Sequence, residues 1–450
     1  MLGIQASRLR LSMVAALTFL AQVSEQSQGQ DVSSPAAGQP ETQPAKDDGL
    51  SKRIDEFLAS VPETTGDDKR WAASKFGDPA HPGFFSDELI QQYRAKSRRT
   101  IEAAVSADFP SLVASVKSAV FTIETRNSRG EPLKQGSAFL LDAYTVVTNL
   151  HVVDGAASAR LIGAHEEVYE VLGLLEADER SDLVTLASVI PEEAIALQVA
   201  HEVPREGERV FVIGAPRGLS GTVTDGLVAA VRQDADARVV LQITAPISPG
   251  SSGSPVINGS GFVIGIATSQ IVEGQNLNFA MDVARVPLQS SGALPVPLPL
   301  SVWTDSRGRE ALAATAAVFA KIKACDEDDV AARDRLWEER LEYANRAVLC
   351  MPDSTEAWRV KGACEFFMWF VDIHRGRFRF AESDEYFRRA RDAATTATHL
   401  DPNDEGAWND LAVYCDMLHL TAEAKSARSR ALKLQAAKAP ATGPLPSGGR

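Results

Sequence analysis

The sequence is poor in cysteine, and no two of its cysteines have the spacing of a metal or redox site. Only four occur in 450 residues, and all lie in the last third of the chain (Cys325, Cys350, Cys364 and Cys415). None forms the Cys-x-x-Cys pattern of zinc sites and thiol oxidoreductases. We therefore expect no metal and no cofactor. The thiols are expected either to pair after export or to be buried among helices.

The chain also lacks an excess of basic residues. Lysine and arginine total 46 against 60 aspartates and glutamates, so the formal net charge is −14. A protein that binds nucleic acid presents a basic face to the phosphates, so we expect no nucleic acid among the partners. The hydrophobic fraction of 44% is ordinary for folded proteins, and 450 residues suggest two or three domains.

Long apolar runs are absent beyond the N-terminus, where one short run follows two basic residues. Leu11 to Val23 is too short to span a bilayer comfortably, and Arg8 and Arg10 precede it. This order is typical of a secretory signal peptide, which we assign to residues 1–23. An uncleaved N-terminal membrane anchor is the alternative. Both interpretations place the rest of the chain outside the cytoplasm, in the periplasm or secreted.

Two segments of different composition come next. Residues 24–50 contain Gln, Ser, Pro, Asp and Gly with almost no large apolar side chains, which predicts a disordered linker. Residues 51–109 are expected to be an N-terminal helical segment, with helical patterns at about 51–61 and 87–105. Ser86 is the expected N-cap of the second helix.

Within a domain assigned to residues 110–290, residues from about 118 to 287 are predicted to be all-β. Short β-branched or apolar runs such as AVFTIET, TVVTNL and RVFVIG alternate there with Gly, Pro, Asp and Asn. Many short strands at close spacing indicate a barrel or sandwich. No strong helical pattern interrupts them, which argues against a parallel α/β sheet.

The last third of the chain is predicted to be helical. A proline-rich, extended linker at 291–306 is followed by a helical region at 307–436 and a flexible tail at 437–450. Within the helical region, Pro352 and Pro402 are each followed six residues later by tryptophan and preceded five residues earlier by alanine.

This spacing of alanine, proline and tryptophan resembles that of the tetratricopeptide repeat, in which small residues allow helices to pack closely. The two prolines are 50 residues apart, whereas the repeat has about 34 residues. We assign the excess to an insertion near 373–383. An unrelated helical bundle is the alternative.

The stretch PISPGSSGSPVI, residues 246–257, contains four serines, and its glycines single out one of them as a nucleophile. Ser252 has Gly250 two residues before it and Gly253 directly after it, so the loop can turn tightly. The amides of Gly250 and Ser252 are then the expected oxyanion hole. Two residues before Ser251 stands Pro249, which has no N–H to donate to an oxyanion. By itself the pattern also fits an inert turn.

A nucleophilic serine requires a base and a group that orients the base. Of the three histidines in the β region, His151 ends an apolar strand, whereas His165 and His201 lie in polar surroundings and are expected at the surface. Asp182 stands at the entrance to a strand and is the expected orienting carboxylate; Asp178 lies in a charged turn.

The three residues occur in the order His…Asp…Ser, which is the order of chymotrypsin. The segments GSAFLLDAYTVVTNLHVVDGA, DERSDLVTLASV and ITAPISPGSSGSPVINGSGFVIGIATS resemble the trypsin-like serine proteases of the HtrA/Deg family over roughly residues 110–286. The resemblance implies two six-stranded barrels with the active site between them. It also implies that His151 is the general base, Asp182 its orienting partner and Ser252 the nucleophile.

Some family features differ in this chain. The family usually has asparagine before the nucleophile and a second glycine after it, where this chain has Ser251 and Ser254. PDZ domains usually follow the protease, but here the helical repeats take that place. The PDZ-based regulation of the family is therefore not carried over. A homo-oligomer, such as a trimer, remains open.

The substrate pocket is expected to be small and neutral. Its walls are assigned to Pro246 and to Thr268, Ser269 and Gln270 on the strand after the nucleophile. Pro246 stands where specificity for Lys or Arg would need an acid, so we expect cleavage after small or medium aliphatic residues.

Together these features predict an exported serine endopeptidase that acts on protein or peptide substrates, with a role in protein quality control. The helical repeats would bind a partner or part of the substrate. The alternative is a catalytically silent protease-like scaffold that acts in protein–protein interaction.

Overall fold

The computed structural model describes residues 87–142, 144–188, 190, 195–215, 221–233, 239–268, 278–283, 297–326, 329–375 and 380–438. The expected signal peptide, disordered linker and first helical pattern lie outside the described residues, as do all but two residues of the expected tail. Within the described residues, no helix combines the length and apolar character needed to cross a bilayer.

Six antiparallel strands close the first barrel in the order β1-β2-β3-β6-β5-β4. Every residue of β3 and β6 is buried, because these two strands are covered on both faces, as expected from their nearly continuous apolar sequences. The strands are β1 (Val120–Arg126), β2 (Pro132–Leu140), β3 (Thr145–Asn149), β4 (Ser158–Ile162), β5 (Val168–Asp178) and β6 (Leu183–Ser188).

A second barrel follows in the sequence. Its strands run in the order β11-β8-β9-β10-β13-β12, and pairing of β11 with β12 closes the ring. The two-barrel architecture is therefore confirmed, with the short strand β7 (Gln198–Val199) added in parallel to β12. The six strands are β8 (Arg209–Gly214), β9 (Thr222–Gln233), β10 (Val239–Ile243), β11 (Pro255–Asn258), β12 (Phe262–Thr268) and β13 (Asn278–Asp282).

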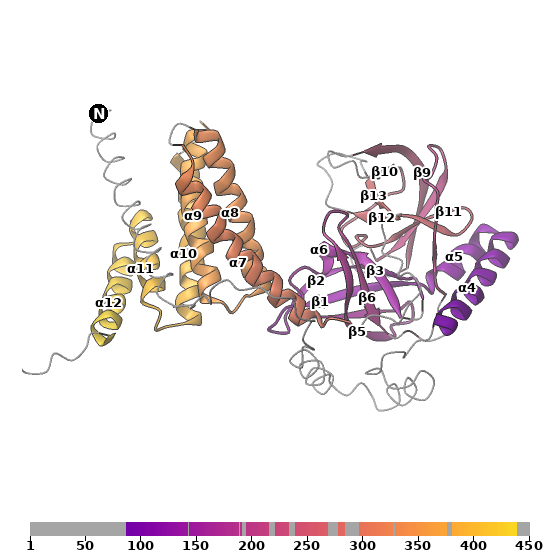
Figure 1. Cartoon of the computed structure of the whole chain (residues 1–450), viewed down its shortest axis with the longest axis horizontal. Helices are drawn as coiled ribbons and strands as arrows, with labels where there is room; N and C mark the ends of the chain where they lie inside the picture. Colours follow the sequence, from indigo (N-terminus) through magenta and orange to yellow (C-terminus); the bar gives the residue numbers. More distant parts are fainter. Residues whose placement is uncertain are drawn as a thin grey trace, which may run out of the picture.

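Two helices ahead of the barrels pack against both of them. Helix α4 (Asp87–Ala107) covers the predicted span 87–105, and α5 (Phe109–Lys117) ends just before the range expected to be β. Arg94 of α4 forms an ion pair with buried Asp142 of the first barrel, at 2.9 Å. Phe109 packs edge-on against Phe211 of the second barrel. The pair of helices lies on the side of the barrels opposite the C-terminal helices (Figure 1).

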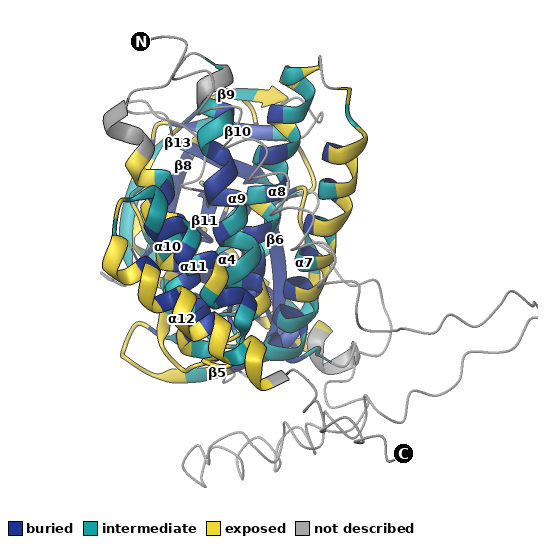
Figure 2. Cartoon of the chain, turned by 90° about the vertical axis from the view of Figure 1, so that its left-hand side faces the viewer, coloured by how far each residue is buried: buried dark blue, intermediate teal, exposed yellow. Residues whose placement is uncertain are grey.

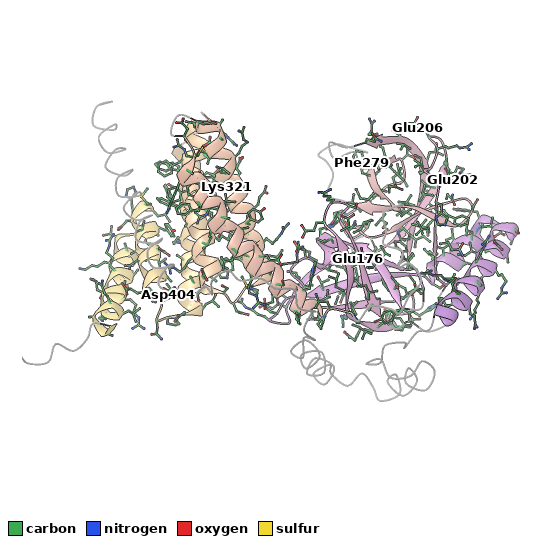
Figure 3. All side chains as sticks on the ribbon, viewed as in Figure 1. Glu176, Glu202, Glu206, Phe279, Lys321 and Asp404 are labelled. Carbon is green, nitrogen blue, oxygen red and sulfur yellow. The ribbon has the colours of Figure 1, made fainter. Side chains whose placement is uncertain are left out.

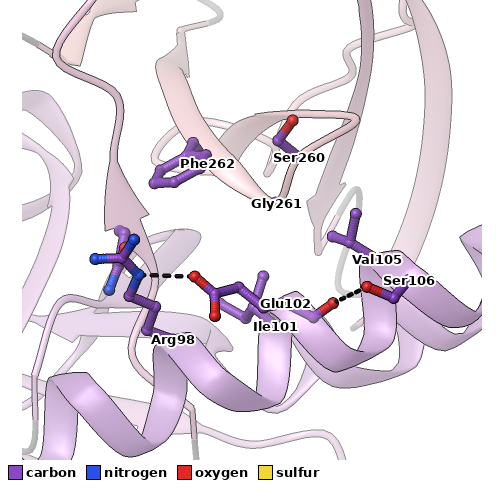
Figure 4. A pocket seen from close by; sticks show the side chains of 9 residues that line it. Arg98, Ile101, Glu102, Val105, Ser106, Ser260, Gly261 and Phe262 are labelled. Carbon is purple, nitrogen blue, oxygen red and sulfur yellow. Dashed lines mark hydrogen bonds and ion pairs between the residues drawn. The ribbon is translucent and has the colours of Figure 1, made fainter.

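Helix α4 also approaches the turn between β11 and β12 very closely. A Cβ at Gly261 would lie 2.4 Å from Ile101 Cγ2, and Gly261 has a φ of +82°, so both sterics and backbone favour glycine there. A cavity of about 250 Å³ opens beside this contact (Figure 4). Arg98 and Glu102 form an ion pair along its rim.

The C-terminal part of the chain is all-helical, as predicted. Figure 2 shows its helices with buried and exposed faces, typical of a layered helical region. The helices are α7 (Leu300–Ala324), α8 (Val330–Cys350), α9 (Thr355–His374), α10 (Phe380–Leu400), α11 (Glu405–Met417) and α12 (Thr421–Lys438).

The two proline turns found in the sequence have the same local structure. Trp358 Nε1 donates to the Pro352 carbonyl at 2.8 Å, and Trp408 Nε1 donates to the Pro402 carbonyl at 3.0 Å. The side chain of Asp404 accepts from the Ala407 amide, which caps the first turn of α11. The two turns are therefore equivalent units at the start of α9 and α11.

The long spacing between these turns comes mainly from the helices themselves. Helix α9 has 20 residues and α10 has 21, whereas α11 has 13. At 3.6 residues per turn, α9 is about two turns longer than α11. Helix α9 reaches His374 and α10 begins at Phe380, so both extend into the range expected to be an insertion; residues 376–379 lie outside the described residues.

The extended linker is shorter than expected, because α7 begins at Leu300 and not after residue 306. Just before it, Leu298 pairs with Leu174 of β5 through two backbone hydrogen bonds of 2.7 and 2.8 Å. Leu300 and Trp303 are buried in the same apolar core as the first barrel. The first turns of α7 are thus part of the protease core, while the end that carries Lys321 lies far from the barrels (Figure 3).

The four cysteines are unpaired, and Cys350, Cys364 and Cys415 are buried. Burial raises the pKa of Cys350 to about 12 and that of Cys364 to about 11, and it raises the pKa of Cys415 as well. The structure thus agrees with the expectation of buried thiols and not with pairing.

This burial predicts slow thiol chemistry. At pH 8 a thiol with a pKa near 11 has a thiolate fraction of about 10⁻³, so only Cys325, which is partly exposed, should react quickly. We expect Ellman's reagent to titrate one thiol in the native chain and four in guanidinium chloride. In Cys325→Ser the fast phase should disappear; several fast thiols in that variant would contradict the burial.

Candidate active site

His151 lies in a short helix that directly follows the inner strand β3. This helix, α6 (Leu150–Val153), begins after Asn149, and His151 remains partly accessible while its neighbours Leu150 and Val152 are buried. The strand thus ends at Asn149, two residues earlier than expected, and His151 follows it in the first turn of the short helix.

Asp182 occupies the turn that enters β6 and accepts two hydrogen bonds from His151. Its Oδ1 accepts from the His151 backbone amide at 2.8 Å, and its Oδ2 lies 2.6 Å from His151 Nδ1. A carboxylate against Nδ1 fixes the proton on that nitrogen, which leaves Nε2 as an acceptor. The imidazole is thus prepared to take a proton at Nε2.

The backbone of Asp182 is held as firmly as its side chain. Its carbonyl accepts from the Leu150 amide and from Asn149 Nδ2, both at 3.0 Å. Asp182 has a φ of +53°, in the left-handed region that aspartate tolerates better than most residues. Such a conformation persists where surrounding hydrogen bonds enforce it and is common at functional sites.

Ser252 lies in the loop that enters β11 and is 4% exposed. Its carbonyl accepts from the Ser137 amide at 2.7 Å, and the Ser137 hydroxyl donates to the Gly250 carbonyl at 2.9 Å. Ser137 belongs to β2 of the first barrel. The loop of the second barrel that carries Ser252 is therefore fixed to a strand of the first.

Ser252 also lies next to the helix that carries His151. A Cβ at Gly136 would lie 2.9 Å from Val152 Cγ2 and 3.0 Å from the Ser252 carbonyl oxygen, so both groups meet at this glycine. Val152 directly follows His151. The structure thus places the Ser252 backbone and the Val152 side chain against the same glycine, and two hydrogen bonds join His151 to Asp182.

The loop conformation depends on glycine at two places. Gly250 and Gly253 have φ values of +96° and +87°, which side chains rarely adopt. A Cβ at Gly253 would lie 1.9 Å from the Ser137 carbonyl oxygen, so no other residue fits without moving the backbone. Both φ values agree with the tight turn expected at these two glycines.

Three amides of the loop are engaged by carbonyl groups and cannot serve an oxyanion. The amides of Ser251, Gly253 and Ser254 donate to the carbonyls of Ser248, Ala267 and Ser251, at 2.9–3.0 Å. The expected donors, Gly250 and Ser252, are not among these three.

The two serines that differ from the family pattern both fit the loop. Ser251 Oγ accepts from the Ser248 amide at 3.3 Å and thus helps to close the turn. Ser254 is fully buried, and a Cβ at Gly214 would lie 2.0 Å from its hydroxyl, so glycine in β8 accommodates the larger side chain.

The expected pocket residues are only partly described. Thr268 is buried at the end of β12, and Pro246 is exposed, with its carbonyl accepting from the Thr224 hydroxyl at 3.0 Å. Ser269 and Gln270 lie outside the described residues. His165 and His201 are exposed, as predicted.

Two residues that support the site were not found from the sequence. Ser137 joins the two barrels, and Lys134 donates to the carbonyls of His151 and Asp154 at 2.6 and 3.2 Å. Ser137 and Ser252 are far apart in the chain, so no local pattern could indicate their contact. The sequence offers one indication of this contact, the pair Gly136-Ser137 at which the buried half of β2 begins.

Comparison with known proteins identifies relatives of the part of the chain that carries this site. Residues 136–266 match the family of the trypsin-like peptidase domain. The putative serine protease HhoB of Synechocystis is 34% identical over 34% of this chain and 39% of its own length. Mouse serine protease HTRA3 is 31% identical over 35% of this chain and 37% of its own.

A probable periplasmic serine endoprotease of Brucella suis, DegP-like, is 39% identical over 32% of this chain and 29% of its own length. Among solved structures, the active form of the Rv3671c protease from M. tuberculosis aligns with 42% of this chain, at 25% identity and a TM-score of 0.37.

The chain thus spans less than half the length of each of these three curated relatives. The family match, residues 136–266, lies within the two barrels. The described residues after the barrels are helices that the family match does not cover. This chain carries a trypsin-like peptidase domain homologous to those of the HtrA and DegP serine proteases, followed by a C-terminal helical region.

Proposed function

We propose that the chain is a serine endopeptidase that cleaves protein substrates through His151, Asp182 and Ser252. The observation that carries the proposal is the Asp182 carboxylate, which accepts from both the backbone amide and Nδ1 of His151. A carboxylate that orients a histidine in this way, in a trypsin-like domain beside a glycine-flanked serine, is the arrangement of acyl-transfer catalysis.

In the proposed mechanism, Ser252 Oγ attacks the scissile carbonyl while His151 Nε2 takes its proton. The Asp182 carboxylate stabilises the imidazolium that forms. The amides of Gly250 and Ser252 hold the oxyanion of the tetrahedral intermediate. His151 then gives the proton to the leaving amine, and water hydrolyses the Ser252 ester by the same steps in reverse.

We further propose that the protein acts outside the cytoplasm in protein quality control, with the helical region binding a partner or a substrate segment. The DegP-like relative is described as periplasmic, and residues 1–23 have the order of a signal peptide. The equivalent turns at Pro352 and Pro402 support a tetratricopeptide-like repeat. The rival function is a catalytically silent scaffold.

The nucleophile can be tested by removing its hydroxyl. In Ser252→Ala we expect kcat to fall by about 10⁶-fold, because the variant lacks the hydroxyl of the proposed nucleophile. A fluorophosphonate probe should label the native chain and fail to label this variant. Ser260→Ala, in the exposed turn between β11 and β12, should keep full labelling. Persistent proteolysis by purified Ser252→Ala would refute the assignment, and an unlabelled native chain would favour the scaffold.

The orienting carboxylate can be tested without changing the shape of the site. Asp182→Asn should lower kcat by about 10⁴-fold with peptide substrates, because an amide favours the wrong tautomer of His151. The KM should change little. Asp178→Asn, four residues earlier, is the matched control and should keep near-native kcat. Equal kcat in the two variants would exclude Asp182 from the proposed role.

Substrate preference follows from the neutral residues assigned to the pocket. With Pro246 and Thr268 in place of an acidic side chain, we expect cleavage after Val, Ala or Ile and little after Lys or Arg. A peptide library analysed by mass spectrometry measures this directly. Efficient cleavage after Arg without cleavage after Val or Ala would contradict this prediction and would indicate an acidic side chain in the pocket.

A further inference from the structure

The turn that follows the His151 helix is seated on the C-terminal helical region. The Thr304 hydroxyl of α7 donates to the Ala156 carbonyl at 2.5 Å. A Cβ at Gly155 would lie 2.6 Å from the Leu349 side chain of α8. Two helices outside the trypsin-like domain therefore contact residues only a few positions after His151.

Arg307 of α7 connects this turn to a second one. Its Nε donates to Asp154 Oδ1 at 3.1 Å, and its Nη1 donates to Glu179 Oε1. Asp154 ends the helix that carries His151, and Glu179 lies in the turn three residues before Asp182. The Arg307 side chain thus links the end of the helix that carries the proposed base to the turn that carries its orienting carboxylate.

The environment of Arg307 restricts its position. The residue is only 7% exposed, and its guanidinium lies 4.8 Å from the centre of the Trp303 ring. The Asp154 side chain is also largely buried, at 14% exposure, so this end of the link is shielded from solvent. A planar guanidinium can bind two carboxylates at fixed angles, which the single ammonium of lysine cannot do.

We propose that Arg307 is a positioning residue, which holds the turns of His151 and Asp182 in the mutual geometry that proton transfer needs. The inference rests on the proposed function, because it assigns Arg307 a role in that same site. It also gives the helical region a direct effect on catalysis: α7 supplies part of the framework of the active site. Small displacements of catalytic groups are costly, so the effect should appear in kcat.

The test compares Arg307→Gln with Arg309→Gln, its matched control. Arg309 lies on the same helix, is exposed, and forms an ion pair within that helix, with Asp305. Active-site titration with a fluorophosphonate counts competent sites, so that kcat can be expressed per site. We expect Arg307→Gln to lower kcat per site about tenfold with KM nearly unchanged. Arg309→Gln should match the native chain, and Arg307→Lys should recover part of the loss.

A second variant tests the link from its exposed end. Glu179→Gln removes one partner and leaves the Arg307–Asp154 contact intact, so it should lower kcat per site in the same direction but less. Glu176→Gln, an exposed residue on the neighbouring strand that Figure 3 labels, is its control. If Arg307→Gln fails to fold, Glu179→Gln and Arg307→Lys decide the question.

The proton between His151 Nδ1 and Asp182 provides a readout independent of turnover. We expect its downfield NMR resonance to shift or broaden in Arg307→Gln and to be unchanged in Arg309→Gln. The proposal would be overturned if Arg307→Gln left both kcat per site and the resonance unchanged. It would also be overturned if the variant only reduced the number of sites that the fluorophosphonate titrates. If the native chain is not labelled at all, the proposed function fails, and the resonance still decides the role of Arg307.

Discussion

The contact between β2 and the loop that precedes β11 is the constraint on which the candidate site depends. Ser137 donates from its amide to the Ser252 carbonyl and from its hydroxyl to the Gly250 carbonyl. Gly253 fits against the Ser137 carbonyl so closely that a Cβ would overlap it. Because His151 and Asp182 belong to the first barrel and Ser252 to the second, the site requires the two barrels to stay in register, and this contact joins them at the Ser252 loop itself.

The first barrel in turn depends on what surrounds it. On one side α4 and α5 contact both barrels through the Arg94–Asp142 and Phe109–Phe211 pairs. On the opposite side the start of α7 is buried in the core of the first barrel (Figure 1). The helical region is therefore joined to the protease by shared packing and not merely by a tether, which gives it a physical route to the turns around His151.

Local sequence was sufficient where short-range chemistry defines the structure. Apolar runs such as TVVTN and LVTLAS gave buried strands, because residues covered on both faces must be apolar. Pro352 and Pro402 marked two equivalent turns, since proline, a capping side chain and tryptophan act over only a few residues. The linker is shorter than the proline content predicts, because α7 begins at Leu300. Proline just ahead of the first turn is compatible with a helix, so the prolines did not exclude a helix start there.

The sequence by itself determined the all-β class of the first domain, the helical C-terminal region and the three candidate catalytic residues, because glycine spacing, strand patterns and residue order are local or ordinal properties. The expectation of two barrels came from the resemblance to the HtrA/Deg family. Only the tertiary structure decided that Ser137 joins the barrels and that Arg307 reaches Asp154 and Glu179. These contacts connect residues more than a hundred positions apart, and their geometry depends on how whole barrels and helices pack. A hydrogen bond between such residues leaves no periodicity in the chain, so only the folded structure reveals it.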